Sequence, residues 1–189
     1  MLEGLLIQQC APTLAGIKCA NLFMYIFNNK QEAEDELINA NKTLNERGVY
    51  IIPLKWQDTS VLIYTFRKTS LLSYLLDSKV KYVLGRCGYD VDEQDPEKYL
   101  KLSIDCLIRN IKKSDCFPHE IGLFLGYPVE DVIGFIRYKG RNCKLCGLWK
   151  VYSDVDNKQK IFDKYKRCTE IYEKIFAQGR SMRDMTVVA

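Results

Sequence analysis

Two strand-like runs constrain the fold of this chain more than any other feature. They are VYIIPLKW (residues 49–56) and VLIYTFR (61–67), and the four polar residues QDTS separate them. Runs rich in β-branched and aromatic residues with a short polar connection are typical of a β-hairpin. Pro53 cannot donate a hydrogen bond to a neighbouring strand. We therefore expect the first strand to lie at a sheet edge or to carry a bulge at Pro53.

The first half of the chain adds a strand and a helix to this hairpin. After a turn-like CAPT, the run NLFMYIF (21–27) has the composition of a buried strand. Apolar residues then recur at helical spacing between Gln31 and Glu46, and Gly48 stands where a glycine would end the helix.

Two helices are predicted next, over residues 70–84 and 96–112. Asp95 before Pro96 is typical of a cap followed by a first-turn proline. One apolar stripe then follows the second helix at Leu100, Ile104, Leu107 and Ile111.

The C-terminal part predicts a late strand, CGLWKVYSD (146–154), and a long helix that is capped by Asp156 and closed by Gly179. The core-facing stripe of this helix is formed by Ile161, Tyr165, Cys168, Tyr172 and Ile175. We interpret Cys168 as a packing residue. Together these elements favour a single α+β domain over residues 1–189, with two layers, a three- to four-stranded, mainly antiparallel sheet and several helices.

The chain has no apolar run long enough to cross a membrane and no export signal at its start, so we expect a cytoplasmic protein. Its eight cysteines are then expected to be thiols rather than disulfides. Cys143 and Cys146 form a CxxC, but no second pair completes the four ligands of a structural zinc site.

Charge is unevenly distributed along the chain. Between Arg137 and Asp184 there are 13 Lys and Arg residues against 6 Asp and Glu residues. Such a surface suits an anion or an acidic partner protein, and Lys158, Lys164 and Lys166 are the candidate contacts. Nucleic acid is not favoured. A helix-turn-helix is conceivable around residues 121–140, but its second helix carries Glu130 and Asp131 instead of base-reading residues.

FPHEIGLFLGYP (117–128) contains the single histidine of the chain. Pro118 fits the first position of a helix, which would place His119 and Glu120 in its first turn. Gly126 then ends this helix and Pro128 begins another. In a purely structural interpretation, Glu120 complements the helix dipole. In a functional one, His119 acts as acid or base and Glu120 orients it.

A nucleophile for that functional interpretation is available in QQCAPTLAGIK. Cys10 precedes Pro12, which we interpret as a turn residue, and Thr13 and Lys18 add a hydroxyl and a cation. A neighbouring cation would favour the Cys10 thiolate, so we expect its pKa to be lowered. We therefore predict thiol or redox chemistry on a small ligand at a site formed by Cys10, Thr13, Lys18, His119 and Glu120.

Two alternatives remain open at this point. The protein is a non-enzymatic binding or adaptor protein that offers its basic C-terminal helix to an acidic partner, or it binds haem or iron through His119. The sequence identifies no cofactor and does not decide whether the protein is an enzyme.

Several motifs resemble one known family along nearly the whole chain. CAPTLAGIKCANLF, FPHEIGLFLGYPVEDVIGFI, CGLWKVYSD and FDKYKRCTEIYEKIFAQGRSMRDMTVVA are similar to the domain of unknown function numbered 3793, found in clostridia and related anaerobes. The resemblance implies only a loose link to redox or iron metabolism, with flavodoxin as a natural acidic partner. Positions that match the family pattern are Cys10, Pro12, Thr13, Gly16, Lys18, His119, Glu120, Gly122, Gly126 and Pro128.

Overall fold

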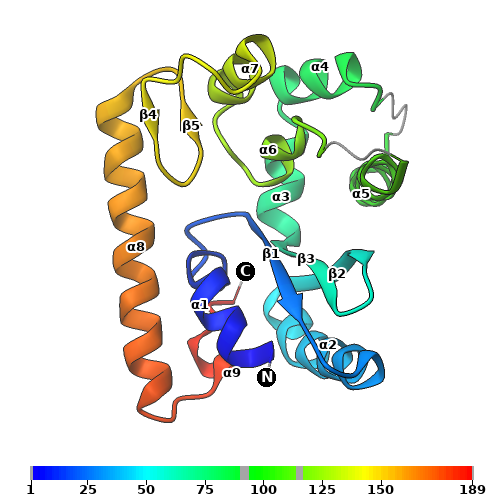
Figure 1. The fold of residues 1–189 in the computed structure, drawn as a ribbon, viewed down its shortest axis with the longest axis vertical. Coiled ribbons are helices and arrows are strands. Elements are labelled where there is room, and N and C mark those ends of the chain that lie inside the picture. Colours follow the sequence, from blue (N-terminus) through cyan, green and yellow to red (C-terminus); the bar gives the residue numbers. More distant parts are fainter. Residues whose placement is uncertain (1, 90–93, 114–116, 189) are drawn as a thin grey trace. The chain divides into compact units, whose positions relative to one another are not determined.

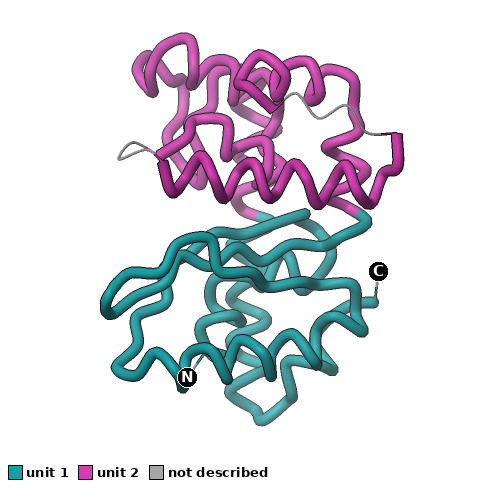
Figure 2. The backbone as a smooth tube through the Cα atoms, turned by 90° about the vertical axis from the view of Figure 1, so that its right-hand side faces the viewer, with its two compact units in different colours: residues 1–69, 164–189 teal, residues 70–163 magenta. Residues whose placement is uncertain are grey.

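A computed structural model gives the fold and describes residues 2–89, 94–113 and 117–188 (Figure 1). The chain forms two compact units (Figure 2): unit 1 comprises residues 1–69 and 164–189, and unit 2 comprises residues 70–163. The chain enters unit 2 within helix α3 (Lys68–Leu75) and returns to unit 1 within helix α8 (Val155–Ala177). That the whole chain is one domain stays a prediction.

Unit 1 is built on a three-stranded antiparallel sheet in the order β1-β3-β2. Its strands are β1 (Ala20–Ile26), β2 (Val49–Trp56) and β3 (Ser60–Arg67), so the predicted hairpin and the preceding strand are confirmed. β2 lies at an edge, and its register shifts between Pro53 and Lys55. Both expected consequences of Pro53 are therefore present.

Helices α1 (Leu2–Leu14) and α2 (Lys30–Leu44) pack on this sheet. The side chain of Asn29 caps α2 by accepting hydrogen bonds from the N–H groups of Gln31 and Glu32. A turn of 3-10 helix, η1 (Asn45–Arg47), continues the chain to Gly48, whose φ of 75° ends the helical segment as predicted. Leucine, isoleucine and aromatic side chains from both helices and all three strands form one core.

Helix α1 was not predicted, because Pro12 indicated a turn at CAPT. The structure places Pro12 inside the last turn of α1, and the helix ends at Leu14, two residues before Gly16, which has a φ of 75°. Arg67 stabilises this end. Its buried guanidinium donates hydrogen bonds to the backbone carbonyls of Thr13 and Leu14, which have no partner within the helix, and to the carbonyl of Val187. Val187 follows the short C-terminal helix α9 (Met182–Met185).

Unit 2 begins with α3 and α4 (Ser78–Arg86), where one continuous helix over 70–84 was predicted. That prediction is wrong because Asp77 interrupts the helix. Its carboxylate accepts hydrogen bonds from the N–H groups of Lys79 and Val80 and starts α4.

Helix α5 (Pro96–Lys113) matches the prediction closely. Asp95 accepts hydrogen bonds from the N–H groups of Glu97 and Lys98, as a capping residue does. The predicted stripe, Leu100, Ile104, Leu107 and Ile111, is buried.

The stretch from 117 to 140 forms a helix, a tight turn and a second helix, as predicted, but the first helix is shorter. Helix α6 (Ile121–Phe124) begins after Glu120, so His119 and Glu120 lie in the preceding turn and not in its first turn. Gly126 has a φ of 69°, and Pro128 caps α7 (Val129–Tyr138).

Only part of the predicted strand 146–154 is strand. Two short strands, β4 (Leu145–Cys146) and β5 (Lys150–Val151), form a small antiparallel hairpin. Beyond Val151 the backbone N–H groups of Tyr152 and Ser153 donate to the carboxylate of Asp131, so they do not extend the strand.

The long helix α8 is present, but it begins at Val155, which places Asp156 in its first turn and not at the cap. Asp154 precedes the helix with a φ of 50°, and its carboxylate accepts from the side-chain amide of Asn157. Gly179, with a φ of 88°, follows the end of α8. The predicted stripe is half-buried along its length, at Ile161, Tyr165, Cys168, Tyr172 and Ile175.

The protein is therefore α+β, with a three-stranded antiparallel sheet, a two-stranded sheet and a majority of helix. Within the described residues, no helix combines the length and the apolar character needed to cross a bilayer.

Candidate functional site

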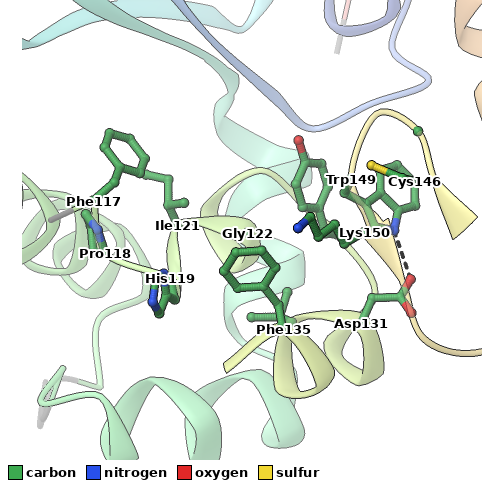
Figure 3. A pocket seen from close by; sticks show the side chains of 13 residues that line it. Phe117, Pro118, His119, Ile121, Gly122, Asp131, Phe135, Cys146, Trp149 and Lys150 are labelled. Atoms are coloured by element: carbon green, nitrogen blue, oxygen red, sulfur yellow. Dashed lines mark hydrogen bonds between the residues drawn. The ribbon is translucent and has the colours of Figure 1, made fainter. Parts of the chain in front are cut away.

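Unit 2 contains an apolar pocket of about 600 Å³ beside the turn that carries His119 (Figure 3). Four large aromatic side chains dominate its wall, and the side chains of His119, Asp131, Cys146 and Lys150 add further polar groups. The lining residues are Phe117, Pro118, His119, Ile121, Gly122, Tyr127, Asp131, Val132, Phe135, Cys146, Gly147, Trp149 and Lys150. They come from the 117–128 stretch, from α7 and from the β4–β5 hairpin.

Asp131 holds two of these elements together. It is 1% exposed, and it projects from the first turn of α7. Its carboxylate accepts hydrogen bonds from the indole N–H of Trp149 at 2.8 Å and from the backbone N–H groups of Tyr152 at 2.8 Å and Ser153 at 3.3 Å. Hydrogen bonds to a charged acceptor are stronger than neutral ones. Asp131 therefore fixes the β4–β5 hairpin on α7 and sets the orientation of the Trp149 ring.

Trp149 is also held by two rings. It stacks on Tyr127 with 4.7 Å between ring centroids and an interplanar angle of 24°, and it meets the edge of Phe162 at 4.5 Å and 86°. Both arrangements are favourable for aromatic pairs. The largest ring of the pocket is thus fixed before any ligand binds.

Glycines allow the elements around the pocket to approach closely. A Cβ at Gly122 would lie 2.9 Å from a methyl carbon of Val132, and one at Gly147 would lie 2.2 Å from a ring carbon of Phe162. Gly134 is a buried residue of α7, and a Cβ there would lie 2.4 Å from the ring of Tyr152. Any side chain at these positions would require its neighbours to move.

The remaining polar groups lie at separate places on the wall. The ring of His119 is exposed and contacts the ring of Phe135 edge-on, with centroids 5.1 Å apart. Lys150 is half-buried; its ammonium lies 6.0 Å from the Phe135 centroid and donates a hydrogen bond of 2.6 Å to the carbonyl of Gly140. Cys146 is exposed. In Figure 3, Phe135 stands between the His119 side of the pocket and the side with Trp149.

Glu120 does not line the pocket. It accepts a hydrogen bond of 3.1 Å from the hydroxyl of Tyr89, a side chain that is only 3% exposed. Burial, and then the charge of Glu120, raise the pKa of Tyr89. Glu120 therefore bonds to the buried hydroxyl of Tyr89, while His119 packs on Phe135.

The first predicted motif lies in unit 1. Cys10 and Thr13 are completely buried on α1, and the Thr13 hydroxyl donates a hydrogen bond of 2.7 Å to the side chain of Asn21 on β1. Lys18 lies close enough to influence the titration of Cys10 and has its ammonium 5.9 Å from the centroid of Tyr165. The structure thus brings Cys10, Thr13 and Lys18 together around the end of α1.

The titration behaviour of this cluster differs from the expectation. Burial raises the pKa of Cys10 to about 12, and the neighbouring hydroxyl of Thr65 and the charge of Lys18 oppose this only in part. Burial lowers the pKa of Lys18 to about 8. The predicted lowering of the Cys10 pKa is therefore wrong, because the loss of hydration on α1 outweighs the neighbouring cation.

Cys10, Thr13 and Lys18 belong to unit 1, whereas His119 and Glu120 belong to unit 2. That all five form one site stays a prediction.

The three candidate lysines of the basic surface lie on α8. Lys164 and Lys166 are exposed, and Lys158 is half-buried. Successive residues of an α-helix are rotated by about 100°, so Lys164 and Lys166 point roughly 160° apart. Lys164 and Lys166 therefore lie on different faces of α8, and binding of a partner by all three lysines stays a prediction.

Sequence reasoning missed the pocket residues outside the 117–128 stretch. Asp131 and Trp149 were assigned only to a helix and a strand. One signal was available: Asp131 directly precedes the apolar residues Val132 and Ile133 near the start of the helix, where a buried carboxylate needs partners. The CxxC was noted, and Cys146 lines the pocket. In the described part of the chain, no group of three His, Cys, Asp or Glu side chains is arranged to hold a metal ion.

Comparison with known proteins supports the family resemblance. The family described as "Protein of unknown function (DUF3793)" matches residues 6–186, which include nearly all of both units. No curated protein and no solved structure matches the chain. The chain therefore belongs to the DUF3793 family of proteins of unknown function.

Proposed function

We propose that this protein binds a small ligand with an aromatic ring system in the pocket of unit 2. The observation that carries the proposal is the pocket itself: about 600 Å³ of space, walled mainly by aromatic and aliphatic side chains, with a few polar groups. Ligand sites for small organic molecules have this size and this composition.

The ring arrangement supports an aromatic ligand in particular. Phe117, Phe135, Tyr127 and Trp149 present ring faces and edges from three different elements. Trp149 is already fixed by Asp131 and Tyr127, so binding does not have to order it. A wall that is ordered in advance lowers the entropic cost of binding.

A neutral dye, N-phenyl-1-naphthylamine, tests the proposal because its fluorescence rises in apolar surroundings. The expected result is saturable binding with one dye per chain. Phe135→Ala is expected to weaken binding about tenfold, since loss of a stacked ring costs ~1–3 kcal/mol. Tyr82→Ala is the matched control, because Tyr82 is an aromatic residue of the same unit that is 70% exposed.

Phe135→Leu separates a binding defect from a folding defect, because it keeps an apolar side chain in the wall. It is expected to retain the fold and to bind the dye with intermediate affinity. Absence of saturable binding to the wild-type protein, or equal binding by Phe135→Ala, would overturn the proposal.

Thiol or redox chemistry at Cys10 is the less supported proposal. Its support is the clustering of Cys10, Thr13 and Lys18 in unit 1 and the position of His119 in the pocket wall. The raised pKa of Cys10 counts against a thiolate nucleophile at neutral pH.

An adaptor role for α8 rests on its exposed cations. Charge reversal at Lys158, Lys164 and Lys166 tests it with an acidic protein such as flavodoxin as the probe. Because Lys164 and Lys166 point in different directions, single reversals are expected to differ strongly if one face of α8 binds the partner. Equal effects of the single reversals would instead indicate a general attraction between opposite net charges.

Haem binding through His119 has one supporting observation, the position of the imidazole in the wall of an aromatic pocket. Titration with haemin tests it. An absorbance change that saturates in the wild type and is lost in His119→Ala would support haem ligation, and the same change in both proteins would exclude His119 as the ligand.

A further inference from the structure

We infer that the ligand of this pocket is an anion: a planar aromatic molecule with a carboxylate, sulfonate or phosphate group that pairs with Lys150. This inference rests on the proposed pocket and adds the chemical class of its ligand. It follows from the different partners that Lys150 and Asp131 have within the protein.

Lys150 brings a positive charge to the pocket wall. Its ammonium carries three N–H donors, and among the residues that the structure describes it bonds to the carbonyl of Gly140 and forms an ion pair with no carboxylate. A half-buried ammonium keeps its charge at a lower cost when an anion lies beside it. Lys150 therefore has both the charge and the donors to bind an acidic group.

The acid of the pocket does not neutralise this cation. Asp131 accepts three N–H groups, from Trp149, Tyr152 and Ser153, and these hydrogen bonds stabilise its charge within the protein. The two ionisable groups are thus used differently. Asp131 fixes the position of Trp149 in the pocket wall, and Lys150 lines the space that a ligand would fill.

The sequence around Lys150 strengthens the positive field. Residues 137–150 contain five cations and no acidic residue. The other four are exposed: Arg137, Lys139, Arg141 and Lys144. Clustered charge of one sign raises the local concentration of oppositely charged molecules. This segment leads directly into the β4–β5 hairpin, so its field acts at the pocket.

Aromatic rings beside cations are also found where single-stranded nucleic acid binds. We favour a small molecule here, because the four aromatic rings line a single pocket of about 600 Å³. A ten-residue oligothymidine serves as the probe for the other possibility.

Two dyes with the same ring system test the inference. 8-Anilinonaphthalene-1-sulfonate is an anion, and N-phenyl-1-naphthylamine is its neutral counterpart. Lys150→Gln is expected to weaken binding of the sulfonate about tenfold more than binding of the neutral dye, a difference of ~1.4 kcal/mol. Lys150→Arg keeps the charge and is expected to preserve most of the affinity for the sulfonate. Lys174→Gln is the control at an exposed lysine of α8 in unit 1.

The salt dependence of dye binding gives a second readout. If only the aliphatic part of the Lys150 side chain packed against the ligand, binding would not depend on salt. Raising NaCl from about 50 mM to about 500 mM is expected to weaken binding of the sulfonate dye to the wild-type protein and to have little effect on its binding to Lys150→Gln.

The outcomes distinguish a failure of the anionic-ligand inference from a failure of the pocket proposal. If the neutral dye does not bind the wild-type protein, the pocket proposal fails. If the neutral dye binds and Lys150→Gln affects both dyes equally or neither, the pocket stands and the anionic ligand is refuted. Displacement of the sulfonate dye by the oligothymidine at lower concentration than by free thymidine monophosphate would refute the small ligand and indicate a nucleic-acid strand.

Discussion

The indole N–H of Trp149 donates a hydrogen bond of 2.8 Å to the carboxylate of Asp131, which is 1% exposed. This pair joins the β4–β5 hairpin to α7. It also orders the ring that forms a large part of the pocket wall, so the stability of the hairpin and the shape of the pocket depend on the same carboxylate.

Asp131→Asn tests this dependence. The amide keeps the size of the side chain but removes the charge and turns one acceptor into a donor that faces other N–H groups. Since hydrogen bonds to charged groups contribute ~1.5–3 kcal/mol each, we expect the free energy of unfolding to fall by about 2–4 kcal/mol. Urea denaturation measures this.

Glu130→Gln is the matched control, because Glu130 is the exposed neighbour of Asp131 on α7. It is expected to change the free energy of unfolding by less than about 0.5 kcal/mol. Equal effects of the two amide substitutions would show that Asp131 does not hold the hairpin.

Gly147→Ala tests the close approach of the hairpin to Phe162. The added Cβ would lie 2.2 Å from a ring carbon, so either the ring or the hairpin has to move. We expect a loss of about 1–3 kcal/mol in the free energy of unfolding.

Gly85→Ala provides the opposite case in the same unit. Gly85 lies in α4 with no atom within 4 Å of the new Cβ. Alanine there is expected to stabilise the protein by up to about 1 kcal/mol, because it favours the helix. If Gly147→Ala and Gly85→Ala change the free energy of unfolding in the same direction, the close contact between Gly147 and Phe162 does not limit the size of residue 147.

Arg67→Lys tests the hydrogen bonds by which the Arg67 side chain stabilises the end of α1. Lysine keeps the charge but cannot reach the carbonyls of Thr13, Leu14 and Val187 with one planar group. The carbonyls of Thr13 and Leu14 also accept from the backbone N–H groups of Gly16 and Val187, so they keep a partner in the variant. Hydrogen bonds from a charged donor contribute ~1.5–3 kcal/mol each, and their loss is expected to lower the free energy of unfolding by about 2–4 kcal/mol in chemical denaturation. Arg180→Lys, at an exposed position, should be neutral. A neutral Arg67→Lys would show that the guanidinium does not stabilise this end of α1.

Cys10 should make stability fall at high pH. Its pKa is raised in the folded protein from an ordinary value of 9.0 to about 12. Between these values the unfolded chain loses the Cys10 proton and the folded protein keeps it, so the free energy of unfolding decreases as pH rises above about 9. Lys18, with its pKa lowered from 10.5 to about 8, acts in the opposite direction between pH 8 and 10.5.

Cys10→Ala is therefore expected to flatten the decline above about pH 10.5, where Lys18 no longer opposes it, as measured by denaturation at a series of pH values. In the native protein at pH 8, a thiol reagent should modify the exposed Cys146 quickly and Cys10 only after unfolding. Rapid modification of Cys10 under native conditions, identified by mass spectrometry, would restore the hypothesis of a reactive thiol.

Local sequence signals predicted much of the fold where they agreed with the packing. The polar connection and Pro53 predicted the hairpin and its edge, and Asp95 before Pro96 predicted the start of α5. These features depend on backbone conformation and on hydrogen bonds between near neighbours, which the sequence shows directly.

The failures occurred where distant residues decide the structure. Pro12 indicates a turn by itself, but α1 continues through it because buried contacts and Arg67, 55 residues later in the chain, stabilise its last turn. The strand predicted for 146–154 ends early because Asp131 takes its N–H groups. The pocket likewise depends on the contact between α7 and the β4–β5 hairpin, which local sequence signals do not show. The prediction therefore included His119 but not Trp149.

The central claim, that the pocket of unit 2 binds an aromatic ligand, is tested most directly by the indole N–H signals in a nitrogen-15 correlation spectrum. The chain has two tryptophans, so Trp56→Phe assigns both signals. Titration with N-phenyl-1-naphthylamine is predicted to shift the Trp149 signal progressively until one dye is bound per chain, and to leave the Trp56 signal in place. A spectrum in which the Trp149 signal does not move at saturating dye would contradict the account.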